Sequence, residues 1–246
     1  MDFLEPPSYQ LHDVYRSLNV LGKECDLIQS ETYRNSHLVG KRNDKLLFYD
    51  CTNYYFEIED EDGIKRYGKS KEHRPNPIIQ MGMFMDGDGI PLVFSLFPGN
   101  ANEQTSIKPL EEKILKEFDC QKFIYCSDAG LGSEKIRKYN HMGEIAFVVT
   151  QSIKKLNEQD RQWALDIKGF KRLSDNKVVD PAEISNDDET IYYKDAPYTP
   201  KDLSQRLIIT YSPKYAKYQK AIREKQVERA KLMLEKGSIK KRKKKS

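Results

Sequence analysis

The spacing of apolar residues changes along the chain, and each change predicts a different kind of secondary structure. Near the N-terminus, Leu11, Val14, Leu18 and Leu21 recur at helical spacing, which predicts a helical segment over residues 1–44. This segment holds too little apolar material to form a core of its own. We therefore expect it to pack against the residues that follow.

From Lys45 onward the pattern is that of β-strands. Three runs rich in β-branched and aromatic residues come before any further helix, at 46–52, 78–85 and 91–97. The second and third runs flank the turn sequence DGDG, which is typical of a hairpin. The first 50 residues of this region therefore predict three consecutive strands, of which the last two are antiparallel.

Helical and strand patterns then alternate as far as residue 154. An amphipathic helix pattern at 107–118 precedes a short apolar strand that ends at Asp128, and a short helix pattern at 133–142 precedes a β-rich run at 146–153. A helix that connects two strands of one sheet makes those strands parallel. The order strand-strand-strand-helix-strand-helix-strand therefore predicts an α/β domain with a mixed sheet over residues 45–154.

The last third of the chain has a less regular pattern. Prolines and glycines interrupt short β-prone runs up to about residue 210, which predicts a separate, partly β subdomain. A long helical pattern then starts at Pro213 and stops at Gly237. We assign residues 155–236 to this subdomain with its long C-terminal helix, and residues 237–246 to a basic tail.

Charge is placed unevenly along the chain. The net charge is +4, but the tail from Lys240 to Lys245 carries six basic residues, and removing them from the 42 basic residues leaves 36 against 38 acidic ones. The predicted folded body is thus close to neutral, and Lys240, Lys241 and Arg242 of the tail are candidate contacts to nucleic-acid phosphates. A solvated terminus is the alternative for such a run.

Composition excludes several classes of protein. Hydrophobic residues make up 38% of the chain and charged residues 33%, and no apolar run approaches the roughly 18 residues that span a bilayer. The N-terminus lacks the basic-then-apolar pattern of a secretory signal, so we expect a cytoplasmic protein without a membrane partner. The four cysteines form no CxxC pair and have no histidine at metal-ligand spacing, which favours packed, reduced thiols over a zinc site.

Two aspartates interrupt the apolar strands. Asp50 lies inside the first strand, LLFYDCT, and Asp128 ends the fourth, FIYCSD. A carboxylate buried in such a strand requires a charged partner, a hydrogen bond or a metal. If the two strands are parallel neighbours, both carboxylates reach the same edge of the sheet, where ligands of α/β proteins bind. Paired carboxylates favour Mg²⁺ or Mn²⁺, although an aspartate at a strand end is often only a turn former.

Four sequence motifs around these aspartates resemble a known family. YDCTNYYFE, YGKSKEHRPNP, MGMFMDGDGIPLVFSLFPGNANEQTS and CSDAGLGS, in this order, look like the catalytic region of bacterial insertion-sequence transposases with a DDE active site. The similarity runs from about Tyr9 through the final helix. It implies a ribonuclease H-like core, an insertion subdomain at 155–236, and cleavage and joining of double-stranded DNA at transposon ends with Mg²⁺ or Mn²⁺. It also implies that Asp50 and Asp128 are catalytic metal ligands.

The third acid of the family has no clear counterpart in this chain. Family members carry a Glu on a later helix, with a Tyr seven residues before it, an Arg four residues before it and a Lys seven residues after it. The nearest stretch, YQKAIREKQ, places Tyr218, Arg223, Glu224 and Lys225 at other spacings. The resemblance therefore implies a truncated, inactive transposase. The alternatives are a catalytically dead DNA-binding remnant, or a ribonuclease H-like nuclease that completes its site with Glu57 or another local carboxylate.

The polar loop between the first two strands adds candidate DNA contacts. Lys69, Lys71 and Arg74 lie in this loop, which the predicted sheet places near the edge that holds the aspartates. Phosphate contacts of this kind position DNA without reading its sequence. A merely solvated loop is the alternative, and the resemblance is compatible with a homo-oligomer as well as a monomer.

Overall fold

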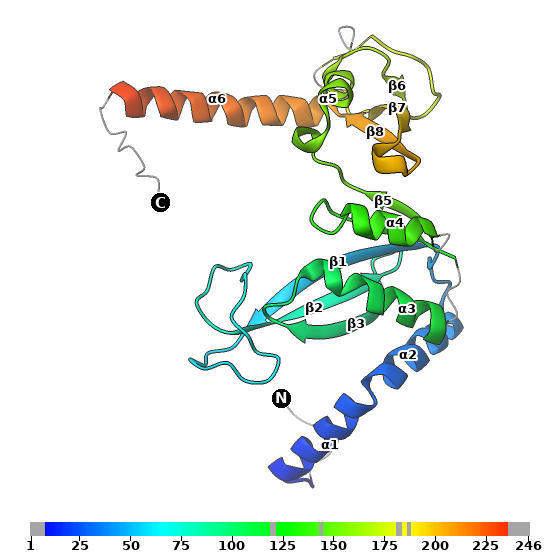
Figure 1. Ribbon diagram of the computed structural model, residues 1–246, viewed down its shortest axis with the longest axis vertical. Coiled ribbons are helices and arrows are strands. Elements are labelled where there is room, and N and C mark those ends of the chain that lie inside the picture. The colour runs from blue at the N-terminus through cyan, green and yellow to red at the C-terminus, as the bar shows by residue number, and fades with distance from the viewer. Residues whose placement is uncertain (1–7, 119–121, 143–144, 181–183, 186–187, 236–246) are drawn as a thin grey trace. The chain divides into compact units, whose positions relative to one another are not determined.

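The chain divides into two compact units, residues 1–152 and 153–246 (Figure 1). The computed structural model describes residues 8–118, 122–142, 145–180, 184–185 and 188–235. The predicted DNA contacts Lys240, Lys241 and Arg242 lie outside these described residues. Among the described helices, none combines the length and the apolarity that a bilayer crossing requires.

The first unit is built on a five-stranded sheet with the strand order β3-β2-β1-β4-β5. Its strands are β1 (Leu46–Tyr55), β2 (Ile78–Met85), β3 (Pro91–Pro98), β4 (Ile124–Ser127) and β5 (Ala146–Val149). The pairs β1–β2 and β2–β3 are antiparallel, whereas β1–β4 and β4–β5 are parallel. The predicted mixed sheet, an antiparallel meander followed by parallel additions, is therefore confirmed.

Helices occupy the segments where apolar residues recur at helical spacing. The helices of this unit are α1 (Leu11–Lys23), α2 (Cys25–Val39), α3 (Ile107–Glu117) and α4 (Glu134–Met142), with a 3₁₀ turn η1 (Glu103–Thr105). The first strand is longer than expected, because Asn53 pairs with Gln80 and the ladder with β2 continues to Tyr55. The last strand is shorter than expected: β5 ends at Val149, and Ile153 begins a 3₁₀ turn, η2 (Ile153–Lys155).

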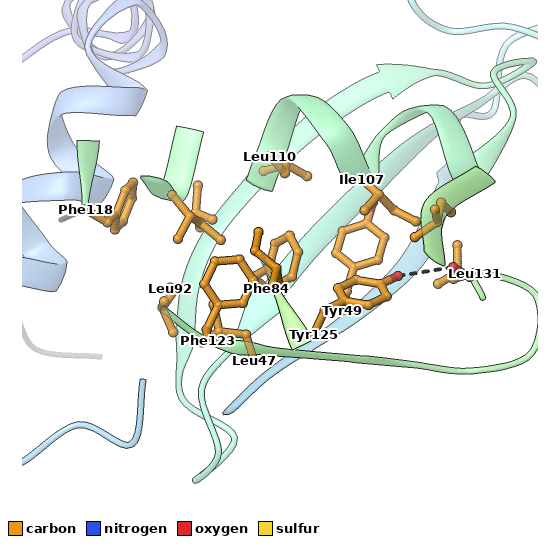
Figure 2. Packing of buried hydrophobic residues seen from close by; sticks show 14 of the residues in the cluster. Leu47, Tyr49, Phe84, Leu92, Ile107, Leu110, Phe118, Phe123, Tyr125 and Leu131 are labelled. Atoms are coloured by element: carbon orange, nitrogen blue, oxygen red, sulfur yellow. Dashed lines mark hydrogen bonds between the residues drawn. The ribbon is translucent and has the colours of Figure 1, made fainter. Parts of the chain in front are cut away.

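One face of the sheet carries the hydrophobic core. Leu47, Tyr49 and Cys51 alternate with exposed residues along β1, and all three are buried. They belong to one cluster with residues of α3 and α4, among them Ile107, Leu110 and Ile136. Figure 2 shows how the rings of Tyr49, Phe84 and Tyr125 stand beneath α3, where the Tyr125 hydroxyl donates a 3.2 Å hydrogen bond to the Leu131 carbonyl. Both helices that follow β3 therefore cover the same face.

The N-terminal helices differ in how they pack, and this corrects the expectation that the whole segment packs on the core. In α2, Tyr33 is buried and its ring contacts Phe118 at 5.3 Å between centroids. In α1 no residue is buried, and the predicted stripe of Leu11, Val14, Leu18 and Leu21 is exposed. The reason is geometric: α2 leads directly into β1 and packs along β3, and α1 precedes it without reaching the sheet cluster.

A buried ion pair fastens the β2–β3 turn to the segment after α2. Arg42 Nε donates a 2.6 Å hydrogen bond to Asp86 Oδ2, and both side chains are almost fully buried. Asp86 Oδ1 also accepts hydrogen bonds from the backbone of Asp88 and Ile90. The DGDG sequence is therefore a hairpin turn, as predicted, and its first aspartate is a structural residue.

The second unit contains a three-stranded sheet and two α-helices among its described residues. Its elements are α5 (Glu158–Leu165), β6 (Lys171–Arg172), β7 (Tyr192–Tyr198), the 3₁₀ turn η4 (Pro200–Asp202), β8 (Gln205–Tyr211) and α6 (Pro213–Glu235). The three strands form an antiparallel sheet in chain order. The buried Lys194 donates hydrogen bonds from Nζ to the carbonyls of Trp163 and Asp166 and lies over the Trp163 ring. This lysine caps the C-terminal end of α5.

Candidate active site

Asp50 and Asp128 follow matching positions on neighbouring parallel strands. The parallel register of β1 and β4 pairs Phe48 with Cys126, the last pair of the ladder. Asp50 is two residues beyond Phe48 within β1, and Asp128 is two residues beyond Cys126, directly after the end of β4 at Ser127. The two strands are therefore adjacent and parallel, as predicted, but Asp128 lies in the loop after β4 and not in the strand. That the two carboxylates lie within reach of one metal ion stays a prediction.

The environment of Asp50 differs from the buried one that the apolar strand suggested. The Asp50 side chain is 67% exposed, and its neighbour Phe48 on the same face is also exposed. Residues of this strand alternate, and only the Leu47, Tyr49 and Cys51 face is covered by helices. Because α3 and α4 both cover that face, Asp50 stands on the open face of the sheet. Because the Asp50 carboxylate is exposed, it needs no partner to offset a cost of burial.

Hydrogen bonds orient one oxygen of each carboxylate. Asp50 Oδ1 accepts a 2.7 Å hydrogen bond from the Cys51 amide. Asp128 Oδ1 accepts hydrogen bonds of 2.9 Å and 3.1 Å from the amides of Gly130 and Leu131. Asp128 thus acts as a turn former in the loop after β4, which was the alternative to a functional role. The two roles are compatible, because Oδ2 of each aspartate accepts no hydrogen bond from the described residues.

A lysine of the polar loop lies beside Asp50. Lys71 Nζ is 3.8 Å from Asp50 Oδ1 and also donates a hydrogen bond to the Cys51 carbonyl. The Lys71 amide donates a 3.3 Å hydrogen bond to the Asn53 side chain, which ties the loop to β1. The loop between β1 and β2 therefore returns to the edge of the sheet where Asp50 lies, as the strand order suggested.

The other two basic residues of the loop have different surroundings. Arg74 donates a 2.9 Å hydrogen bond to Glu72, and its guanidinium lies 4.1 Å from the centre of the Tyr55 ring. The hydrogen bond to Glu72 raises the pKa of Arg74, so its charge is already paired. Lys69 lines a polar pocket next to the loop after β4. Of the three predicted DNA contacts, Lys71 lies beside Asp50, whereas Arg74 pairs with Glu72.

The two aspartates suit a hard divalent cation in part. Carboxylate oxygens are the ligands that Mg²⁺ and Mn²⁺ prefer, and the ammonium group of Lys71 beside Asp50 shows that this position attracts a positive charge. Within the described part of the chain, however, no group of three or more His, Cys, Asp or Glu residues is placed to hold a metal. A site formed by Asp50 and Asp128 therefore supplies two protein ligands there.

The two candidates for a third acid lie on different elements. Glu57 lies beyond the end of β1, and the five steps from Asp50 to Tyr55 span about 16 Å of strand. Glu224 lies exposed on α6 of the second unit. The alternative of a nuclease that completes its site with Glu57 or another local carboxylate stays a prediction.

The sequence analysis did not predict two polar features of the first unit. One is the pocket lined by Lys69, which forms where Gly68 and Gly99 of two loops approach each other. The other is a buried acid, Glu111 of α3, which lies beside the buried Asn140 of α4. Glu111 is four residues after Ile107 and three before Ile114, so the helical stripe itself places it on the buried face.

Comparison with known proteins gives few matches. No protein-family model matches the chain, and no curated protein matches it. Two solved structures are similar in part. The Mos1 transposase paired-end complex with left transposon end is 14% identical at a TM-score of 0.30, and the match covers 60% of this chain and 45% of that one. The Mos1 strand transfer complex is 12% identical at a TM-score of 0.31, with 62% and 46% covered. This chain thus spans less than half the length of either.

Proposed function

We propose that the first unit is the catalytic core of an insertion-sequence DDE transposase with a ribonuclease H-like fold. The observation that carries this proposal is the parallel pairing of β1, which holds Asp50, with β4, which Asp128 follows directly, together with Lys71 beside Asp50. The strand order β3-β2-β1-β4-β5 and the four sequence motifs around both aspartates support it. The proposed substrate is double-stranded DNA at the ends of a transposon, and the proposed cofactor is Mg²⁺ or Mn²⁺.

Each residue of the site has a defined task in this proposal. Oδ2 of Asp50 and Oδ2 of Asp128 are the oxygens left for a cation, because Oδ1 of each is engaged by backbone amides. A divalent cation bound there supplies Lewis-acid activation of a water or a hydroxyl for attack on a phosphodiester. Lys71 provides positive charge for the phosphate at the same edge of the sheet. The turn formed by Gly130 and Leu131 keeps Asp128 in place.

Metal binding tests the site directly. We expect Mn²⁺ to broaden the amide NMR signals of residues 48–52 and 126–131 selectively, and Asp50→Asn or Asp128→Asn to abolish that effect. Asp60→Asn is the matched control, because Asp60 is an exposed carboxylate in the loop after β1. Broadening that is equally strong in the Asp50→Asn and Asp128→Asn variants would refute the proposed site.

The 246-residue chain alone is expected to cleave DNA poorly. Phosphoryl transfer needs both the attacking and the leaving oxygen held by positioned charge, and no group of three or more His, Cys, Asp or Glu residues is placed to hold a metal within the described residues. An error of about 1 Å in position can cost about a hundredfold in rate. The assay is a labelled duplex incubated with the chain and Mg²⁺ or Mn²⁺. Robust cleavage that disappears in Asp50→Ala would contradict this expectation.

The shortage of carboxylates also favours a second proposed function, a DNA-binding protein without catalytic activity. In that case DNA binding persists without metal. Deleting residues 240–246 should weaken non-specific binding and flatten its salt dependence, because each neutralised phosphate contributes close to one unit of slope in a log–log plot. Binding that is unchanged across a salt titration would show that the tail does not contact DNA.

A further inference from the structure

The two N-terminal helices follow one another as a nearly continuous rod. Only Glu24 lies between α1 and α2. Hydrogen bonds of the helical type cross this junction, because the Glu24 amide donates one of 3.0 Å to the Val20 carbonyl and the Glu24 carbonyl accepts one of 2.9 Å from the Ile28 amide. Figure 1 shows α2 continuing the line of α1. From Leu11 to Val39 the rod is about 42 Å long.

One side of this rod carries a heptad pattern. Mostly apolar residues recur in alternating steps of three and four along both helices. They are Leu11, Val14, Leu18, Leu21, Cys25, Ile28, Thr32, Asn35 and Val39. These nine residues, the heptad stripe, occupy the a and d positions of four heptads, a spacing typical of a coiled coil. Eight of them are exposed and Cys25 is half-buried, so the stripe is available for a contact.

The other side of α2 packs against the sheet of its own chain. Ser30 and Tyr33 are buried there, and the Gln29 side chain accepts a 2.7 Å hydrogen bond from the Phe94 amide of β3. These residues occupy the f, b and e positions of the heptads. Because the a and d positions lie on the opposite side of a helix from b and f, the heptad stripe faces away from this core.

A groove of about 740 Å³ follows the heptad stripe along α2. Its lining from α2 consists of residues at the a, d, e and g positions, which are Ile28, Glu31, Thr32, Asn35, Ser36 and Val39. Ile90 of the β2–β3 turn also lines it, and its side chain is exposed. In a coiled coil these four kinds of position form the holes that receive the side chains of a second helix.

The polar positions of the stripe determine which helix fits and in which direction. In a parallel pair of identical rods each residue meets its own copy, so Asn35 faces Asn35 and the two amides hydrogen-bond, a device that sets the register of coiled coils. In an antiparallel pair Asn35 faces a leucine of α1, and Glu24 meets a second glutamate. Thr32 suits burial, because its hydroxyl donates a 2.6 Å hydrogen bond to the Ile28 carbonyl. The stripe therefore complements a parallel copy of itself.

We propose that two copies of this chain associate through a parallel coiled coil of their α1–α2 rods. The groove of each copy receives a and d side chains of the other, and the same stripe is used twice about a two-fold axis. Two rods of this length bury on the order of 1,000 Å² in total, the low end of specific interfaces. We expect a dimer that forms at micromolar concentration and separates on dilution. The contact goes beyond the proposed function and does not depend on the metal site.

Analytical ultracentrifugation of the full chain, whose monomer mass is 28.8 kDa, measures the association. A series from about 0.1 to 100 µM brackets a micromolar dissociation constant. We expect Leu18→Gln to weaken the dimer about a hundredfold, because it removes one leucine from each rod. Val20→Gln is the matched control: Val20 and Leu18 are both 56% exposed, but Val20 lies on the other side of α1. Because α1 has no buried residue, both variants should keep the wild-type amide NMR signals of β1 and β4.

Cys25 reports the direction of the rods. It occupies an a position, so in a parallel pair its two copies face each other. Copper(II)–phenanthroline takes one electron from each thiol, both protons leave, and a disulfide joins the two chains. The experiment uses Cys120→Ser chains, in which the remaining cysteines Cys51 and Cys126 are buried. We expect a covalent dimer on a non-reducing gel, and we expect Cys25→Ser to abolish it.

A wild-type chain that stays monomeric over the whole series would overturn the proposal, including one whose α1 binds anionic lipid vesicles instead. A dimer that Leu18→Gln leaves intact, or that Val20→Gln weakens equally, would overturn the assignment of the heptad stripe. A dimer that depends on Leu18 but gives no disulfide through Cys25 would overturn the parallel direction.

Discussion

The buried acid Glu111 makes the first unit less stable as the pH rises. Its side chain is fully buried between α3 and α4, and neither carboxylate oxygen has a hydrogen-bond partner among the described residues. Burial raises the pKa of Glu111 to about 8, although the nearby Asn140 amide opposes the shift. At neutral pH the folded protein therefore keeps this group protonated, whereas the unfolded chain ionises it near its ordinary value of 4.5.

The sign and size of the effect follow from proton linkage. Between pH 4.5 and 8 the folded state binds more protons than the unfolded state, so the free energy of unfolding falls as the pH rises. Each pH unit in this window lowers the free energy of unfolding by about 1.4 kcal/mol. The loss between pH 5 and 7 is therefore about 2 to 3 kcal/mol. Below pH 4.5 this contribution is fully present, and above pH 8 it is gone.

Glu111→Gln removes the titration and keeps the shape of the side chain. We expect the variant to lose most of the slope between pH 5 and 8 and to be more stable than the wild type at pH 8. The single tryptophan, Trp163, lies in the second unit, so unfolding should be followed by the NMR signals of β1 and β4 amides in urea at several pH values. Glu112→Gln is the matched control, because Glu112 is only partly buried and its Oε1 lies 3.9 Å from Lys108 Nζ. Equal slopes in the wild type and Glu111→Gln would refute this reasoning.

Three further substitutions test other contacts. Arg42→Met should destabilise the first unit by about 3 to 5 kcal/mol, because it leaves the buried Asp86 uncompensated, and a urea midpoint like that of the wild type would contradict this. Lys71→Gln should tighten Mn²⁺ binding by about two- to fivefold by removing the cation that competes for Asp50, and weaker binding in calorimetry would count against that competition. Lys194→Met should cost the second unit about 1 to 3 kcal/mol by leaving two carbonyls unpaired, which the tryptophan fluorescence would report, and an unshifted unfolding curve would exclude it.

The strands and the pairing of β1 with β4 were predictable because they depend on local patterns. Alternating apolar residues mark each strand, and the order of strands and helices decides which strands are parallel. These two rules place β1 next to β4 without any knowledge of packing. The length of β1 was not predictable from turn propensity, because pairing with β2 carries Asn53 into the ladder.

The features that were missed depend on contacts between distant segments. The exposure of Asp50 follows from the side of the sheet on which α3 and α4 lie, and the exposed stripe of α1 follows from how far that helix stands from the core. The pocket exists because Gly68 meets Gly99 across two loops, and single glycines in a sequence do not reveal such partners. Local periodicity thus positions the acids, while tertiary contacts decide their surroundings.

The parallel pairing of β1 with β4 also determines when the site can form during folding. The β2–β3 hairpin closes over a short turn, an event of microseconds, whereas Phe48 and Cys126 are 78 positions apart along the chain. Pairing over such a separation has a high entropic cost and is slow, so the β1–β4 ladder closes late. On the ribosome it cannot begin before β4 has been synthesised. A chain that ends before β4 therefore lacks the β1–β4 ladder, and the edge of the sheet that Asp128 follows forms only when the sheet is complete.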